Sequence, residues 1–304
     1  MKRYLLATFA LLLVGGFGFL HYHHLDVLLW QQWKLNRQPM PAQAMDLGRY
    51  RVDIEALPIA ELDDDLSALT YNSESDTLFG LVNGTPLIVE LSLDGQLLRQ
   101  IRVEGVRDME GLTHVAGDRY VIAEERNQRL REIDIPDGAT ELDVTNAPSL
   151  TIAVDEKANK GLEGLSWDAA GQRLLVVKER DPMRVMSITG FVGQVADASI
   201  SIQLEPSLPA ENLFVSDLSS LNADSRSGHV LLLSDESHMV VEYTADGTPV
   251  SVLGLWRGMA GLERTVPQAE GLTVDNQRRV YVVSEPNLFY RFVPVDQADR
   301  SIAQ

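Results

Sequence analysis

The motif MEGLTH at residues 109–114 decides the fold, because variants of it recur along the chain. The related stretches are LSALTY at 66–71, LEGLSW at 162–167, LSSLNA at 218–223 and AEGLTV at 269–274. Their starts lie 43–56 residues apart, and self-similarity at such a period is the signature of a repeat architecture. A turn and further β-rich runs follow each copy.

The repeats have the strand content of propeller blades. In the first repeat, four runs with strand character cover residues 66–71, 77–82, 87–93 and 97–103, and Asp94-Gly95 separates the last two. Asp-Gly between alternating runs is a strong hairpin signal, and Asp246-Gly247 provides it again in the fourth repeat. A four-stranded antiparallel meander of about 50 residues has the size of one blade. We therefore predict an all-β fold, a five-bladed β-propeller over residues 49–304.

The last repeat contains only three such runs, at 271–274, 279–284 and 288–293. Tyr50–Ala56 alternates like a strand but precedes the first repeat. We expect this segment to pair with the last blade as its missing outer strand, which would close the ring and cover two sheet edges. This arrangement favours five blades over six.

The N-terminus has the pattern of a membrane signal. Lys2 and Arg3 precede an uncharged, mostly apolar stretch from Tyr4 to Leu20. We expect residues 1–24 to form an uncleaved signal anchor, a transmembrane helix that holds the chain in the inner membrane as a single-pass protein with its propeller in the periplasm. A cleaved signal peptide is the alternative. Residues 25–48 would form a juxtamembrane linker, with Trp30 and Trp33 near the headgroups.

The charge and the absence of cysteine exclude several functions. The net charge is −18, and residues 1–48 contribute +2, so the remainder carries −20. Such an acidic surface repels nucleic acid and attracts cations. Without cysteine, the chain has no disulfides, no thiolate zinc site and no cysteine nucleophile.

Acidic residues recur at two positions of the repeat, the second residue of each motif and a residue 15–17 positions later. In antiparallel strands joined by a tight turn, such positions lie side by side, so we expect all ten residues at one mouth of the central channel. Seven of them are glutamates. The ten residues are Ser67, Glu110, Glu163, Ser219, Glu270, Asn83, Glu125, Glu179, Glu236 and Glu285.

Seven converging carboxylates repel one another unless protons, basic side chains or a cation neutralise them. A flexible, oxygen-only ligand set favours Ca²⁺, with Mg²⁺ as the other hard cation. We therefore predict a calcium site made by glutamates. Those on the inner strands are the primary ligands, and the others are ligands or support them. The primary ligands would be Glu110, Glu163 and Glu270, and the others Glu125, Glu179, Glu236 and Glu285.

An alternative without metal remains open, because Arg126, Lys178 and Arg180 adjoin some of the glutamates and could form ion pairs with them. The run Asp63–Asp65 is either a solvated loop or a further contribution to the same mouth.

The sequence resembles the SdiA-regulated, YjiK-like family of bacterial membrane-anchored propellers. The stretches that carry the resemblance are EGL at 163–165, QAEG at 268–271 and above all VSEPNLFYRF at 283–292. The resemblance covers the chain from about residue 50 to its end, together with the N-terminal layout. It implies a five-bladed propeller with a calcium site, distantly related to NHL-repeat and gluconolactonase-like propellers, and it supplies no reaction.

Three functions fit these observations. The first is a calcium-stiffened binding module for a protein, peptide or small ligand. The second is a calcium-dependent hydrolase of lactones or phosphoesters, with His114 or a glutamate as base; His238 is the other histidine near the channel. The third is a structural role in the cell envelope. We expect the binding module, since the sequence contains no complete catalytic constellation.

Overall fold

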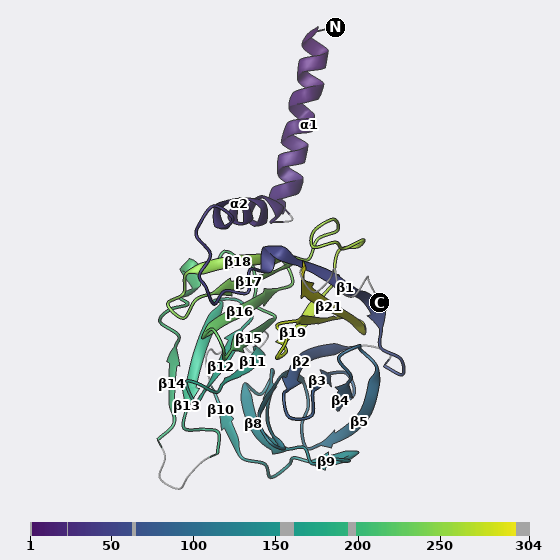
Figure 1. Cartoon of the computed structure of the whole chain (residues 1–304), viewed down its shortest axis with the longest axis vertical. Coiled ribbons are helices and arrows are strands. Elements are labelled where there is room, and N and C mark those ends of the chain that lie inside the picture. Colours follow the sequence, from purple (N-terminus) through teal and green to yellow (C-terminus); the bar gives the residue numbers. More distant parts are fainter. Residues whose placement is uncertain (1, 23, 63–64, 153–160, 194–198, 296–304) are drawn as a thin grey trace.

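The computed structural model describes residues 2–22, 24–62, 65–152, 161–193 and 199–295. It confirms the five-bladed β-propeller (Figure 1). Each blade is an antiparallel sheet with its first strand against the central channel. The strands of blades 1 and 2 are β2 (Leu66–Asn72), β3 (Thr77–Val82), β4 (Leu87–Leu91), β5 (Leu97–Glu104), β6 (Met109–Ala116), β7 (Arg119–Glu124), β8 (Arg129–Asp134), β9 (Glu141–Asp143) and β10 (Ser149–Thr151).

The other three blades follow in chain order, except that the outer strand of blade 5 comes from the start of the chain. Blade 3 contains β11 (Leu162–Asp168), β12 (Arg173–Lys178), β13 (Arg184–Thr189) and β14 (Ser201–Leu204). Blade 4 contains β15 (Ser220–Asp224), β16 (His229–Ser234), β17 (Met239–Tyr243) and β18 (Pro249–Gly254). Blade 5 contains β19 (Ala269–Val274), β20 (Val280–Ser284), β21 (Leu288–Pro294) and β1 (Tyr50–Pro58).

Two tight turns follow the sequence signals directly. Gly95 and Gly247 adopt φ values of 78° and 80° in the hairpins β4–β5 and β17–β18. This left-handed conformation costs glycine little, which is why Asp-Gly marks these positions.

Strands β1 and β21 pair antiparallel, from Tyr50 opposite Pro294 to Pro58 opposite Leu288. The first and last blades also share buried side chains: Leu69 and Val89 of blade 1 pack in one cluster with Tyr281 and Phe289 of blade 5. Four further clusters fill the spaces between the other neighbouring blades. The apolar core is therefore divided into five parts that lie between blades.

Blade 1 differs from the expected four-stranded sheet. The segment β9, which connects two strands of blade 2, adds a fifth strand to it, parallel to β5, with Arg102 opposite Glu141. An outer strand with free backbone groups is a site for unwanted pairing, and β9 covers that edge.

A ring of polar side chains links the inner strands around the channel. These side chains occupy the fifth position of each repeat, and we call them the hydroxyl belt: Thr70, Thr113, Ser166, Asn222 and Thr273. Each of three hydroxyls accepts a hydrogen bond from a backbone N–H of the next blade, as in Thr113 Oγ1 with Trp167 N at 2.9 Å. Thr273 Oγ1 accepts one from Tyr71 N at 3.0 Å, which joins blade 5 to blade 1. The repeated Thr or Ser of the motif thus satisfies a backbone donor of the next blade, whereas Asn222 accepts a hydrogen bond from the Thr273 hydroxyl.

Two helices and a 3₁₀ turn precede the propeller: α1 (Lys2–Tyr22), α2 (Leu25–Leu35) and η1 (Leu47–Arg49); a second 3₁₀ turn, η2 (Ala210–Asn212), lies between blades 3 and 4. Helix α2 inserts Leu28 and Leu35 into the apolar cluster between blades 3 and 4, whereas α1 points away from the propeller (Figure 1). Over the residues described, no helix has both the length and the apolar character needed to cross a membrane, so the transmembrane helix expected within residues 1–24 is not supported.

A candidate metal centre at one mouth of the channel

A backbone irregularity places the second residue of each repeat. In β6, Met109 lies opposite Glu124 and Gly111 opposite Ala123, so Glu110 is an extra residue in the ladder. The register shifts at the corresponding place in β2, β11 and β19, which contain Ser67, Glu163 and Glu270. Such β-bulges commonly redirect a side chain next to a functional site. We call the end of the channel where these side chains lie the acidic mouth.

The glycines after three glutamates allow the inner strands to approach closely. A Cβ on Gly111 would lie 2.6 Å from the carbonyl oxygen of Glu163 in the next blade. A Cβ on Gly164 would lie 2.7 Å from Ser220 Cα, and one on Gly271 would lie 2.8 Å from the carbonyl carbon of Ala68. A side chain at any of these three positions would therefore clash with the inner strand of the next blade.

The three inner-strand glutamates are partly buried and influence one another. Burial raises the pKa of Glu110 to about 9, and the charges of Glu125 and Glu270 add to the shift. Burial likewise raises the pKa of Glu270 to about 8. The pKa of Glu163 lies well above its ordinary value, because of burial first and then the charges of Glu110 and Glu125. These carboxylates therefore lack sufficient positive charge from the protein itself.

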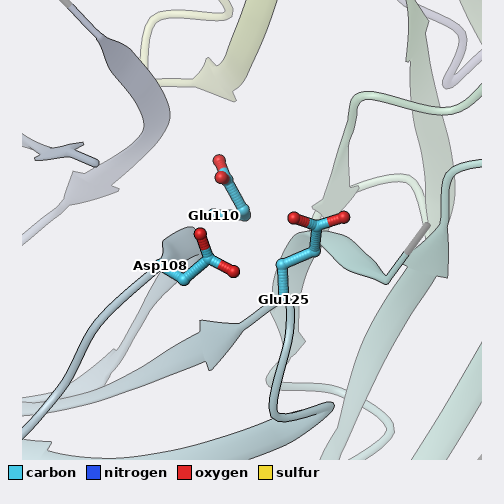
Figure 2. A group of neighbouring side chains, drawn as sticks. All are labelled: Asp108, Glu110 and Glu125. Atoms are coloured by element: carbon cyan, nitrogen blue, oxygen red, sulfur yellow. The ribbon is translucent and has the colours of Figure 1, made fainter. Parts of the chain in front are cut away.

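The tightest carboxylate group is Asp108, Glu110 and Glu125, in which one oxygen of each residue lies within 4.8 Å of the others (Figure 2). Oxygens that bind one Ca²⁺ at 2.3–2.6 Å can be at most about 5 Å apart, so this group meets the distance requirement for a shared calcium ion. Backbone contacts fix part of it: Gly161 N donates to Glu125 Oε1 at 3.1 Å, and Arg126 N donates to Asp108 Oδ2 at 3.0 Å. The Asn83 amide donates to Glu110.

Residues at the ends of the second strands surround this group. In blades 1, 2 and 5, the third residue of the motif pairs with a residue on the second strand, and the mouth residue follows that partner by two positions. In blade 2, for example, Gly111 pairs with Ala123, and the mouth residue is Glu125. In blade 4 that partner is Leu233, opposite Ser220. The register therefore assigns the equivalent position to Asp235.

Glu236, the residue predicted from the sequence, lies one residue beyond this equivalent position, and its role as a metal ligand stays a prediction. Its side chain is 43% exposed and forms an ion pair with Arg180. Asp235 instead accepts a hydrogen bond from Ala269 N at 2.9 Å, and burial raises its pKa. The spacing of 17 residues in this repeat, against 15 or 16 in the others, was the signal in the sequence.

Arg180 neutralises one side of the mouth, because it forms ion pairs with both Glu179 and Glu236. Part of the alternative without metal is therefore correct. The Lys178 ammonium donates to the carbonyl oxygens of Arg180 and Asp181 at 2.6 and 3.3 Å. Arg180 borders a cavity of about 210 Å³. The cavity is lined by Glu163, Glu179, Arg180, Asp217, Ser219, Asp235, Glu236, Gln268 and Glu270.

The residue that precedes the motif is also acidic in three blades; the sequence analysis named Asp65 as a possible contributor but missed Asp108 and Asp217. Asp65, Asp108 and Asp217 occupy this position in blades 1, 2 and 4. The charges of Asp65 and Asp108 both raise the pKa of Glu110, and the pKa of Asp217 itself is raised to about 6, mainly by burial. Their recurrence one residue before the motif was visible in the sequence. Asp63 and Asp64, from the same acidic run as Asp65, lie outside the described residues.

Neither His114 nor His238, the two histidines expected near the channel, lies among the acidic-mouth residues. His114 is four residues after Glu110 on β6, about 13 Å further along the strand at 3.3 Å per residue. Its ring packs against Tyr120, and Nε2 contacts the carbonyl oxygen of Gly117 at 2.9 Å. His238 lies in the β16–β17 turn, where it meets the ring of Trp256 edge-on. His114 is therefore wrongly placed to act as base for a reaction at this mouth.

Three solved structures resemble the chain at low sequence identity. A luciferin-regenerating enzyme matches at 13% identity and a TM-score of 0.49, over 79% of this chain and 95% of that chain. A nidogen/laminin complex matches at 11% identity and a TM-score of 0.46, over 73% of both chains. The β-propeller domain of Myceliophteria thermophila Cps50 (Swd1) matches at 11% identity and a TM-score of 0.42, over 77% of this chain and 65% of that chain.

A family profile gives a more specific result. The profile with the description SdiA-regulated matches residues 42–293, a region that begins before β1, ends within β21 and includes every carboxylate of the acidic mouth. This agrees with the family that the motif VSEPNLFYRF at 283–292 indicates. The chain belongs to the SdiA-regulated family.

Proposed function

We propose that this propeller binds a calcium ion at its acidic mouth and uses the calcium-stiffened face to capture a protein or small ligand. The observation that carries the proposal is the group Asp108, Glu110 and Glu125, three carboxylates brought within the span of one calcium coordination sphere. Glu163 and Glu270 supply further, partly buried carboxylates, whose pKa values are raised mainly by burial and also by neighbouring negative charges.

The two sides of the mouth have different roles in this proposal. Arg180 compensates Glu179 and Glu236, so the side formed by blades 3 and 4 already has a counter-ion. On the side of blade 2, Arg126 contacts Asp108 at 3.2 Å, but its side chain is 79% exposed and contributes little in water. The calcium ion belongs on this second side, with Asp108, Glu110 and Glu125 as its first ligands.

Binding rather than hydrolysis follows from the arrangement of the other groups. A hydrolytic reaction at the metal would need a base close to it, and His114 lies about 13 Å further along its strand. Only carboxylates would remain for that role, and the ion would occupy those nearest to it. The metal therefore serves to order the loops that form the face.

Thermal unfolding tests the proposal. An ion that binds only the folded state at 100 times its Kd stabilises that state by about 2.7 kcal/mol. The full chain in Ca²⁺ should therefore unfold several degrees higher than in EGTA, and Mg²⁺ at the same concentration should give a smaller rise. Equal unfolding temperatures in Ca²⁺ and EGTA would refute the calcium site.

We also propose that the propeller works outside the cytoplasm, at the surface of the inner membrane. The basic residues before the apolar stretch support this placement, as do the exposed apolar side chains of α1, among them Phe9, Leu12 and Phe17. Protease added to spheroplasts should degrade the propeller while a cytoplasmic marker survives. Protection of both would place the propeller inside.

A further inference from the structure

The opposite end of the channel contains a second cavity, of about 170 Å³. We call this end the far mouth; it lies where the inner strands end. All five blades contribute to its lining through the hydroxyl belt, four of whose members, Thr70, Thr113, Ser166 and Thr273, are buried, and we call the belt its floor. Asp108, Glu110 and Glu125, the proposed calcium ligands, do not line this cavity.

The floor is polar but uncharged. The hydroxyls of Thr70, Thr113 and Ser166 accept backbone hydrogen bonds from the neighbouring blades, which fixes their positions. Asn222 adds an amide whose oxygen accepts from Thr273 at 3.3 Å. Hydroxyl and amide groups both donate and accept hydrogen bonds, so the floor suits a ligand that does the same.

The rim has two different sides. Tyr71, His114 and Trp167, from three successive blades, contribute rings on one side. Asn276 and Arg226 line the other, where the Arg226 guanidinium donates to Asn276 Oδ1 at 3.4 Å. The rim therefore combines flat apolar surfaces with directional hydrogen-bonding groups.

The two aspartates beside the cavity are held by their own turns. Asp275 accepts hydrogen bonds from the guanidinium of Arg279 and from the hydroxyl of Tyr281, and Asp224 accepts one from the hydroxyl of Ser227 at 2.6 Å. Their charges are therefore already stabilised within the protein. In this respect the far mouth differs from the acidic mouth, where burial and mutual repulsion raise the pKa values.

We propose that the far mouth binds a neutral, polyhydroxylated ligand of monosaccharide size. A cavity of about 150 Å³ accommodates benzene in another protein, so this one is large enough for a six-membered ring. The uncharged floor would pair with the hydroxyl groups of the ligand, and the Trp167 ring would cover its apolar C–H face. The site lies at the end of the channel opposite the carboxylates and needs no metal.

Calorimetric titration of the full chain tests this inference, with D-glucose, D-galactose and N-acetyl-D-glucosamine as probes. At least one should bind saturably at concentrations up to about 50 mM, and equally well in Ca²⁺ and in EGTA. Trp167→Ala and Asn276→Ala should each weaken binding about five- to tenfold, because each removes a contact to the ligand. Trp256→Phe, which lies outside the cavity, should leave binding unchanged.

Three results would overturn the inference: no saturable heat with any of the three sugars, binding that survives both rim substitutions, or binding that is lost in EGTA. The last would assign the sugar to the calcium site instead. Circular dichroism of the two rim variants should match that of the parent chain, since Asn276 is exposed and Trp167 is only partly buried. The test of the calcium site is independent of this one, because it measures the change in unfolding temperature on adding the ion and not the binding of a sugar.

Discussion

Gly111 and the carbonyl group of Glu163 are in contact across two neighbouring blades, so closely that a Cβ at position 111 would lie 2.6 Å from the carbonyl oxygen. This contact sets the spacing of the inner strands β6 and β11, and with it the distance between the carboxylates of Glu110 and Glu163. Burial is the main cause of the raised pKa of Glu163, and the charge of Glu110 on the neighbouring strand adds to the shift.

Replacing this glycine should separate the two strands. Gly111→Ala forces a methyl group against backbone, and overpacking of this kind costs about 1–3 kcal/mol. The unfolding temperature measured by circular dichroism should fall by several degrees. As a control, Gly138→Asn should have little effect, because Gly138 has open space around it and asparagine tolerates its left-handed φ of 73°. An unchanged unfolding temperature for Gly111→Ala would mean that the strands are not packed this tightly.

The inner-strand glutamates should destabilise the metal-free protein and stabilise the calcium-bound one. Glu110→Gln and Glu270→Gln each remove a partly buried carboxyl group that must either remain charged or take up a proton, so in EGTA each variant should unfold at or above the temperature of the parent chain. In Ca²⁺ the parent should gain stability and the variants much less. Glu104→Gln, at an exposed position on β5, is the matched control and should behave like the parent in both conditions. Full calcium responses in both mouth variants would argue against these ligands.

The metal-free protein should lose stability as the pH rises. The folded-state pKa values of about 9 for Glu110 and about 8 for Glu270 exceed the ordinary value of 4.5, so the folded state holds more protons between these limits. Their contribution is complete below about pH 4.5 and lost as the pH passes through 8 and 9. Unfolding temperatures in EGTA should fall from pH 6 to pH 9, and saturating Ca²⁺ should reduce this slope. A rising or flat profile in EGTA would contradict the burial of these carboxylates.

Removing the internal counter-ion should have the opposite effect to removing a glutamate. Arg180→Gln leaves Glu179 and Glu236 without their shared partner, so the metal-free chain should unfold at a lower temperature and the rise on adding Ca²⁺ should be larger. Arg102→Gln, whose partner Glu141 lies 3.7 Å away at an exposed position, is the control. If the two variants respond alike to calcium, Arg180 has no special influence on the mouth.

The number of blades and the general position of the mouth residues could be predicted from the sequence, because both follow from the repeat. The number of motif copies gives the number of blades, and the antiparallel pairing of the first two strands brings Glu110 and Glu125 to the same end of the channel. The glycines of the motif lie where the inner strands of neighbouring blades approach closely.

Two details of the candidate site depend on more than the period. The shift from Glu236 to Asp235 depends on the strand register: Asp235 directly follows β16, as the equivalent residues follow the second strands of the other blades. The role of Asp108 depends on a residue outside the motif, just before β6 begins. The fifth strand of blade 1 could not be foreseen, because β9 pairs with a blade whose other strands end before it in the chain.

The calcium site is the central claim, and equilibrium dialysis of the full chain against radioactive Ca²⁺ tests it most directly. We predict saturable binding of about one ion per chain at the shared carboxylates, with loss of that binding in the double variant Glu110→Gln, Glu125→Gln. Binding no greater than that of a control protein with similar acidity, or undiminished binding by the double variant, would contradict the account.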